Sequence, residues 1–269
     1  MEFFIGTHHA TQRWFDLGIP LFVSRRVLTE KKKLPKAKCK WALDSGGFTE
    51  LSLYGEWRTS EEHYVEDVKR YAEEIGHLAW AAPMDWMCEP FMLKKTGLPL
   101  YEHQMKTVEN FTRLRQRLGE LVVPVLQGWE LDDYMRCVEY YERCGVELYK
   151  ERLVGVGSVC RRQSTKEAAR IFRTLADLHL KLHGFGVKIA GLQEYSEALT
   201  SSDSMAWSFE ARRLKRRHDR QDALFDWPKK MLCGRMFPTD HKAKSCSNCV
   251  EWALKWRNNI VKDRLEEAA

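Results

Sequence analysis

Short runs of apolar residues along the chain alternate with longer stretches in which apolar residues recur every three or four positions. The short runs have the length of buried strands, whereas the longer stretches have the period of amphipathic helices and end near a glycine. The predicted strands are residues 2–7, 20–24, 40–45, 78–86, 121–128, 153–158, 184–188 and 203–208. The predicted helices between them are residues 60–76, 101–119, 131–145 and 165–184.

Strands that alternate with helices predict a parallel sheet, and eight such strands predict an α/β fold of the (β/α)8 TIM-barrel type. An open doubly wound sheet is the alternative. Because the first two predicted strands are separated by a short segment, we expect an irregular first crossover. We assign the catalytic barrel to residues 1–210, and a basic helix, a small zinc-binding segment and a final helix to residues 211–269. This final helix could pack on the barrel or on a second subunit.

Carboxylates stand where several predicted strands end. In WALDSGGFTE, residues 41–50, an apolar run leads to Asp44 and then to two glycines, which allow a tight turn or a close backbone approach to a ligand. For this segment alone, a polar strand-to-loop turn is the alternative. Asp85 and Asp203 occupy similar positions, and barrel enzymes collect their functional groups at the carboxyl ends of the strands. Core packing alone does not readily explain why several carboxylates would lie at the same end of a barrel.

Composition and charge narrow the function classes. The chain has 269 residues, of which 44% are hydrophobic and 30% charged, as in ordinary globular proteins. No apolar run approaches the roughly 20 residues of a membrane span, and the start of the chain does not resemble a signal peptide, so we expect a cytoplasmic protein. The net charge of +6 is concentrated in residues 25–40 and 212–220. These basic runs are either solvated faces or contacts for a phosphate backbone.

Cysteine usage indicates a metal site. With eight cysteines and no export signal, we expect reduced thiols or metal ligands rather than disulfides. Cys233, His241, Cys246 and Cys249 lie close together in the sequence, the last two with C-x-x-C spacing. Three thiolates and one imidazole form a closed tetrahedral set, which is typical of structural zinc. A surface loop with unrelated thiols is the alternative.

Five motifs at predicted strand ends occur in a familiar order: DSGGF, PMDWMCEP, VLQG, VGVGS and SSDS. Together with the cysteine cluster they resemble the tRNA-guanine transglycosylase superfamily over most of the chain. Spacing and short length most resemble its deazapurine DNA-modifying branch, found in phages and bacterial genomic islands. The resemblance implies a pentosyltransferase that exchanges a guanine in a polynucleotide for a free 7-deazaguanine base, preQ0 or a derivative. It also implies a bacterial or phage-infected host cell.

The resemblance also implies the catalytic residues. Asp203 matches the nucleophile, whose carboxylate would attack C1′ of the nucleotide and form a covalent intermediate. Asp44 matches the second carboxylate, an acid and base for the departing and entering bases. For Asp203 taken alone, a turn or helix-cap residue is the alternative.

The base-binding residues implied by the same resemblance are Ser45, Phe48, Asp85, Gln127, Gly157, Ser158 and Phe185. Asp85 would accept hydrogen bonds from the purine edge, and Gln127 would complete that edge. Gly157 and Ser158 would offer backbone N–H groups and a hydroxyl to the exocyclic oxygen. Phe48 would stack on the base, and Phe185 could stack opposite it or belong to the core.

The superfamily carries a Cys3His zinc site in which clustered cysteines precede a distant histidine. Here Cys233 and His241 precede the C-x-x-C pair, so the order of the ligands differs. The tRNA-modifying bacterial members carry an apolar-Cys-Pro-Thr-Arg run after the nucleophile, whereas this chain has DSMAWSFEARRLKRRHDR. DNA is therefore the expected substrate, with its guanine flipped out. The residues expected to hold its backbone are Arg212, Arg213, Arg216 and Arg217.

Three other functions stay open from the sequence: a tRNA-guanine transglycosylase of unusual length, a non-catalytic zinc-containing nucleic-acid-binding protein, and a barrel hydrolase or lyase acting on a small nucleoside. The expected partners are DNA and the free 7-deazaguanine base, with no membrane. A homodimer and helper proteins stay open.

Overall fold

A computed structural model describes residues 1–159, 166–187, 189–221, 229–237, 239–243 and 245–265. The chain divides into two compact units, Met1–Asp203 and Ser204–Ala269. No helix within these described ranges has both the length and the apolar character needed to cross a membrane.

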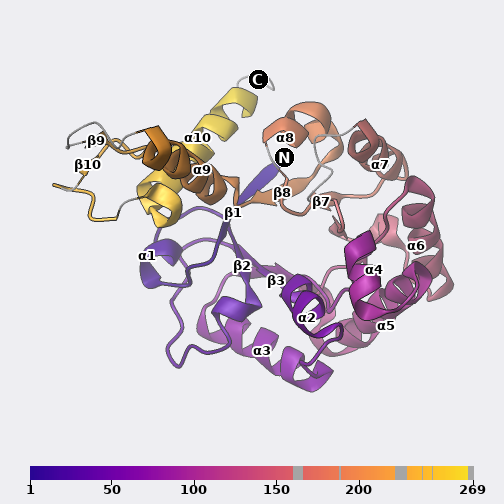
Figure 1. Cartoon of the computed structure of the whole chain (residues 1–269). Coiled ribbons are helices and arrows are strands. Elements are labelled where there is room, and N and C mark those ends of the chain that lie inside the picture. Colours follow the sequence, from indigo (N-terminus) through magenta and orange to yellow (C-terminus); the bar gives the residue numbers. More distant parts are fainter. Residues whose placement is uncertain (160–165, 188, 222–228, 238, 244, 266–269) are drawn as a thin grey trace. The chain divides into compact units, whose positions relative to one another are not determined.

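The first unit is built on an eight-stranded sheet in the order β4-β3-β2-β1-β8-β7-β6-β5 (Figure 1). The strands are β1 (Glu2–Thr7), β2 (Leu21–Ser24), β3 (Trp41–Asp44), β4 (Leu78–Ala81), β5 (Val125–Leu126), β6 (Val154–Val156), β7 (Leu182–Gly184) and β8 (Ser201–Ser204). Neighbouring strands pair in parallel, and an isolated parallel bridge joins Ala81 to Val122 between the outer strands. The α/β prediction with eight parallel strands is confirmed as a curled sheet. The bridge joins only one residue pair, so the predicted closed TIM barrel is seen only as a curled sheet.

Helices connect the strands and pack against one another on the outside of the curled sheet (Figure 1). They are α1 (Gln12–Phe15), α2 (Gly47–Tyr54), α3 (Glu61–Glu74), α4 (Pro90–Thr96), α5 (Leu100–Leu118), α6 (Leu131–Arg143), α7 (Lys166–Asp177) and α8 (Ile189–Tyr195). The first crossover contains only the single-turn helix α1, as its short length predicted. Helices α3, α5, α6, α7 and α8 pack in sequence order, each on the next.

The last two strands do not lie where the sequence predicted them. Strand β7, Leu182–Gly184, falls inside the predicted helix 165–184, because helix α7 already ends at Asp177. Strand β8, Ser201–Ser204, begins two residues before the predicted strand and consists of buried polar residues, which hydropathy does not identify. The residues from Ala206 onward form a helix instead of continuing that strand.

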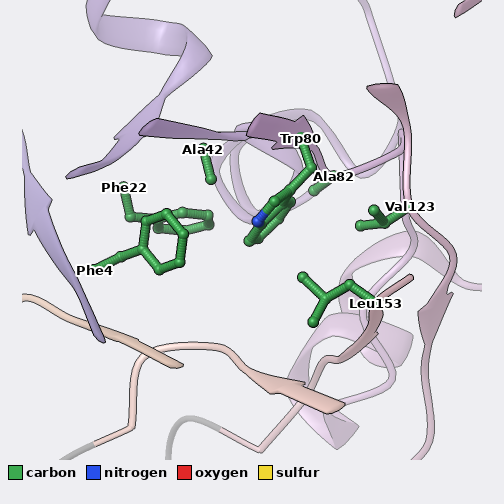
Figure 2. Close-up of a cluster of buried hydrophobic side chains, with 7 residues drawn as sticks. All are labelled: Phe4, Phe22, Ala42, Trp80, Ala82, Val123 and Leu153. Atoms are coloured by element: carbon green, nitrogen blue, oxygen red, sulfur yellow. The ribbon is translucent and has the colours of Figure 1, made fainter. Parts of the chain in front are cut away.

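The interior of the curled sheet is filled by side chains from successive strands and their approaches (Figure 2). The cluster comprises Phe4, Phe22, Ala42, Trp80, Ala82, Val123 and Leu153, all buried. Phe4 meets Trp80 edge-on, with ring centroids 6.0 Å apart. As in other barrel-type sheets, the interior is a packed core, so a ligand must bind at the ends of the strands.

The second unit contains α9 (Ala206–Gln221), β9 (Lys229–Lys230), β10 (Met236–Phe237), the short 3-10 helix η5 (Cys246–Asn248) and α10 (Val250–Leu265). The two short strands pair antiparallel. Helix α10 packs on α9, where Trp252 Nε1 donates to the carbonyl of Trp207 at 2.9 Å. Trp256 Nε1 donates to Glu210 Oε2 at 3.0 Å. The C-terminal helix therefore has a partner within its own unit.

A candidate active site at the carboxyl ends of the strands

Three buried or half-buried carboxylates stand at the carboxyl ends of strands in the first unit. Asp44 is the last residue of β3, Asp203 lies in β8, and Asp85 follows β4. The charge of Asp203 raises the pKa of Asp44, and the charge of Asp44 raises the pKa of Asp85. Asp44 is thus within electrostatic reach of both Asp203 and Asp85, although β2 and β1 separate β3 from β8.

Asp44 is held as a group that can gain or lose a proton near neutral pH. Burial, followed by the charge of Asp203, raises its pKa to about 6, although hydrogen bonds from the Ser24 hydroxyl and the Gly46 N–H act in the opposite direction. Gly46 has φ of 83°, in the left-handed region that favours glycine. A Cβ there would lie 2.9 Å from Arg26 Cγ. The first glycine of DSGG therefore makes both the turn and a close approach.

Asp203 is oriented by the neighbouring strand β7 and the turn that follows it. The residue is 4% exposed, and Oδ1 accepts the N–H of Gly186 at 2.8 Å. His183 Nε2 lies 3.5 Å from the same oxygen. His183 is fully buried, and its Nδ1 lies 2.8 Å from the Ser201 hydroxyl. Within the described residues, all the contacts seen for Asp203 involve Oδ1, so the protein holds one of the two carboxylate oxygens.

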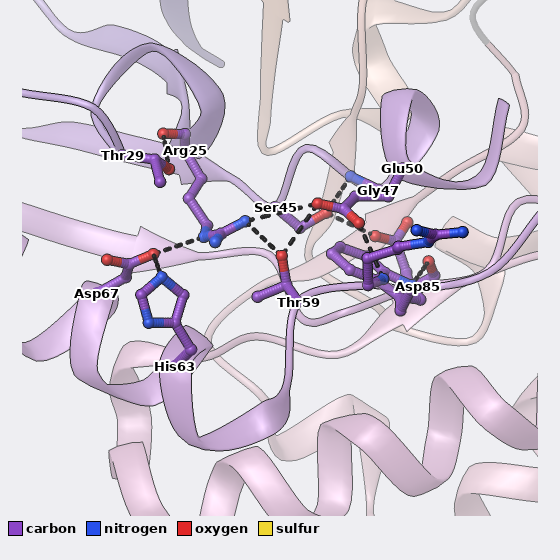
Figure 3. A network of polar contacts seen from close by, with 11 residues as sticks. Arg25, Thr29, Ser45, Gly47, Glu50, Thr59, His63, Asp67 and Asp85 are labelled. Atoms are coloured by element: carbon purple, nitrogen blue, oxygen red, sulfur yellow. Dashed lines mark hydrogen bonds and ion pairs between the residues drawn. The ribbon is translucent and has the colours of Figure 1, made fainter. Parts of the chain in front are cut away.

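Asp85 is the acceptor of a buried network. Ser45 Oγ donates to its Oδ1 at 3.0 Å (Figure 3), and Gln127 Nε2 donates to its Oδ2 at 2.7 Å. Burial raises the pKa of Asp85 to about 7, with the charge of Asp44 as the second cause. Three of the residues predicted for base binding are therefore joined by direct hydrogen bonds.

Ser158 extends this network toward a carboxylate that the sequence analysis missed. Its Oγ lies 2.7 Å from Gln127 Oε1 and 2.8 Å from Glu89 Oε2, and it accepts the N–H of Cys88 at 2.8 Å. A hydroxyl has one proton, so it donates to Gln127 or to Glu89 but not to both at once. Ser158 has φ of 55°, an uncommon conformation for a residue with a side chain.

Gly157 contributes differently from the prediction. Its N–H donates to the carbonyl of Leu126 at 2.9 Å, so this group is engaged in the sheet and is not free to bind a base oxygen. A Cβ on Gly157 would clash with the side-chain amide of Gln127. We infer that glycine is needed here because it leaves room for the Gln127 amide.

The two predicted aromatic residues lie in different environments. Phe48 is 38% exposed on α2 and meets the ring of Phe91 edge-on, with centroids 5.9 Å apart. Phe185 packs on the interior cluster, with ring centroids 4.8 Å from His183 and 5.8 Å from Phe22. Phe185 is therefore better described as a core residue, which was the alternative from the sequence, than as a stacking residue opposite Phe48.

The predicted backbone-binding arginines lie in the second unit. Arg212, Arg213 and Arg216 are exposed on α9. The side chain of Arg217 lies outside the part of the chain that the structure describes.

The predicted metal ligands come together in the second unit. The ligand atoms of Cys233, His241, Cys246 and Cys249 all lie within 4.8 Å of one another. His241 Nδ1 donates to the carbonyl of Ala243 at 2.6 Å, which leaves Nε2 toward Cys246 Sγ, 3.6 Å away. A backbone partner for the second ring nitrogen is usual for a metal-bound histidine. Three thiols and an oriented imidazole fit a tetrahedral zinc ion, and other thiophilic metals share this preference.

A family model for DpdA, described as DeoxyPurine in DNA protein A, matches residues 1–219. The chain belongs to this family. The match covers the strand-end motifs of the first unit and the beginning of α9, and it bears out the resemblance drawn from those motifs.

A search of curated proteins gave no match to this DpdA family member. One similar solved structure is a provisionally named isomerase from Sinorhizobium meliloti in an open-loop conformation, with a TM-score of 0.41 and 13% identity. The match covers 76% of this chain but only 49% of the other, so the chain spans about half the length of that protein. A likeness of this size indicates neither fold nor activity.

Two residues of this DpdA family member join the site without having been predicted. Glu89 is 2% exposed and precedes Pro90, the first residue of α4. A carboxylate directly before a proline marks a helix start, and that signal was present in the sequence. His183 could not be found in the same way, because the apolar periodicity around it predicted a helix.

Proposed function

We propose that this chain is a DNA-guanine transglycosylase that replaces guanine in DNA with a free 7-deazaguanine base. Membership of the DpdA family, whose description names a deoxypurine in DNA, supports DNA as the substrate, and the motif resemblance supports a 7-deazaguanine as the incoming base. The observation that carries the chemistry is the pair of interacting carboxylates Asp44 and Asp203 at one end of the sheet. Glycosyl exchange with retention needs such a pair, one as nucleophile and one as proton donor and acceptor.

In the first step, Asp203 attacks C1′ of a flipped-out deoxyguanosine nucleotide, and the bond from C1′ to N9 of guanine breaks. Asp44, which has a raised pKa, delivers a proton to the departing base and becomes a carboxylate. In the second step, Asp44 takes the N9 proton of the incoming 7-deazaguanine, whose nitrogen attacks C1′ and releases Asp203. Two inversions at C1′ retain the configuration, and no backbone bond is broken.

Asp85 would hold the base during both steps. Its carboxylate accepts hydrogen bonds from Ser45 and Gln127 and has lone pairs left for the N–H groups of a guanine-type edge. An added base donor favours the charged form and thus offsets the raised pKa of Asp85. Phe48, half-exposed on α2, would cover one face of the base.

His183 would position the nucleophile. If Ser201 donates to Nδ1, a neutral ring carries its proton on Nε2, which lies 3.5 Å from Asp203 Oδ1 and has no hydrogen-bond partner within the described residues. Gly186 donates to the same oxygen, which leaves Oδ2 to attack C1′. Zinc bound by the four-residue Cys/His set would have a structural role, because all four protein ligands close the coordination sphere.

The exchange reaction is tested by incubating the protein with guanine-containing DNA and free preQ0, followed by digestion and nucleoside mass spectrometry. The expected product is a 7-deazaguanine deoxynucleoside in the wild type and none in Asp203→Ala. A parallel reaction with tRNA distinguishes the superfamily alternative: exchange in tRNA but not in DNA would overturn the proposal. Turnover of free deoxyguanosine without DNA would favour a nucleoside enzyme.

A further inference from the structure

A groove of about 530 Å3 opens next to the turn that follows Asp44. Its walls come from the segment after β2, from α2 and from the start of α3, all in the first unit. Residues that line it include Arg25, Arg26, Tyr54, Arg58, Ser60 and His63. We call it the arginine groove. Part of its lining comes from the basic run of residues 25–40, which the proposed reaction does not use.

The floor of the groove is a closed polar network (Figure 3). Arg25 is 4% exposed, and its Nε donates to Asp67 Oδ2 at 2.7 Å. Its Nη1 donates to Thr59 Oγ1 at 3.0 Å and lies 4.0 Å from Glu50 Oε1. Glu50 Oε2 also accepts the N–H of Arg58 at 3.0 Å. Arg25 is thus shared between two buried carboxylates, and these contacts fix the shape of the groove.

The rim of the groove carries arginine side chains that, in the described part of the chain, have no buried carboxylate as a partner. Arg26 is exposed, and within the described residues no ion pair is seen for it. Arg58 is 63% exposed and lies 3.5 Å from the equally exposed Glu56, a pairing that contributes little in water. Its guanidinium lies over the ring of Tyr54, 4.7 Å from the centroid. Two acidic residues also line the groove: Glu50, which belongs to the floor, and Glu30, which three lysines follow in the chain.

The groove adjoins the carboxylate site through one tight contact. Arg26 follows two residues after Ser24, whose hydroxyl bonds Asp44. The same arginine packs so closely on Gly46 that a Cβ there would be 2.9 Å from its Cγ. Gly46 is two residues from Asp44, so their Cα atoms are at most about 7.6 Å apart. A nucleotide with C1′ at the carboxylates therefore has its neighbouring phosphates within reach of Arg26.

We propose that the arginine groove binds a phosphodiester of the DNA strand next to the exchanged nucleotide, an inference that rests on the proposed function. Arg26 and Arg58 supply forked donors that match phosphate oxygens, and Tyr54 and Ser60 supply the hydroxyls that commonly contact phosphate and sugar. This contact holds the strand while the base is out of the stack. It differs from the α9 arginines because it belongs to the same unit as the carboxylates.

The test compares Arg26→Ala/Arg58→Ala with a matched control, Arg143→Ala. Arg143 is 70% exposed on α6, pairs with Glu139 at 3.3 Å and lies over the ring of Tyr140, so it resembles Arg58 in exposure, ion pair and ring contact but lies outside the groove. The measurement is the affinity for a fluorescent single-stranded, guanine-containing oligonucleotide, by anisotropy, over a series of salt concentrations. We expect the double variant to bind about 5- to 20-fold more weakly at low salt, with a log–log salt slope shallower by roughly 1.

The control should bind DNA as the wild type does, and unchanged melting temperatures should exclude unfolding of either variant. Wild-type affinity and slope in the double variant, or an equal loss in Arg143→Ala, would overturn the proposal. Loss of inorganic phosphate binding without any change in DNA binding would also overturn it, since the ligand would then be a free anion. Anisotropy does not depend on catalysis, so a shallower slope with no base exchange would contradict the proposed function and leave the groove supported.

Discussion

At the scale of single residues, the site keeps acids in places that disfavour their charged forms. Burial and mutual repulsion raise the pKa of Asp44 to about 6 and that of Asp85 to about 7. A folded protein with such groups binds more protons than its unfolded chain at intermediate pH. Its free energy of unfolding therefore falls as pH rises from about 4 through the folded pKa values. In our account, the folded state is less stable near neutral pH because it keeps a carboxyl group that exchanges a proton there.

The Asp44→Asn variant tests this relation. The amide removes the buried charge, and a pKa shift of one unit corresponds to about 1.4 kcal/mol, so we expect the variant to be about 1 to 3 kcal/mol more stable at pH 7.5. The gain should vanish near pH 3, below the unfolded pKa of about 3.9, where Asp44 is mostly protonated in the folded and the unfolded state. Urea denaturation at both pH values measures it, with exposed Asp177→Asn on α7 as the control. A variant less stable than wild type at pH 7.5 would contradict the relation.

His183 offers a second test at this scale. Phenylalanine fits the surrounding rings of Phe22, Trp80 and Phe185 but cannot donate to Asp203. We expect His183→Phe to remain folded and to lower kcat for base exchange about 10- to 100-fold, with KM for DNA unchanged, because the nucleophile is misplaced. His183→Gln, whose amide can still donate, should retain more activity. Full activity in His183→Phe would show that the histidine is only a core residue.

At the scale of secondary-structure elements, sequence patterns predicted what hydropathy controls. The first six strands, β1 to β6, were located because they are apolar, and α3, α5 and α6 because their apolar positions follow the helical period. Strand β8 was misplaced because its buried residues are serines and an aspartate; Ser201, Asp203 and Ser204 have side-chain hydrogen bonds there. Strand β7 was hidden in a helical pattern. Both errors fall beside Asp203, in a part of the sheet whose buried side chains are largely polar.

The short C-terminal elements depend on their metal ligands in our account. Strands β9 and β10 have two residues each, so little apolar surface holds them. Zinc in sites of this type contributes on the order of 10 kcal/mol of folding free energy. We expect one zinc ion per chain by elemental analysis, and loss of structure around η5 after treatment with a strong chelator. Amide hydrogen exchange of residues 229–249 measures the second effect; no change in exchange after complete metal removal would contradict it.

At the scale of the whole molecule, the order of the motifs in the sequence was enough to predict which strand ends form the candidate site. Asp44, Asp85 and Asp203 are far apart along the chain, but a parallel sheet brings the carboxyl ends of its strands to one side. What the motifs could not provide is the direction of each hydrogen bond. The Gly157 N–H donates to the Leu126 carbonyl within the sheet, and Glu89 lies within hydrogen-bond distance of the Ser158 hydroxyl.

The central claim is that Asp203 bonds covalently to DNA, and the most direct test locates that bond. Wild-type protein is incubated with guanine-containing DNA without an incoming base, denatured, and digested with nuclease and protease before peptide mass spectrometry. Our account predicts a deoxyribose-linked peptide that contains Asp203, absent from Asp203→Asn and depleted when preQ0 is added. A nucleotide linked to Asp44, or efficient base exchange by Asp203→Asn, would contradict it.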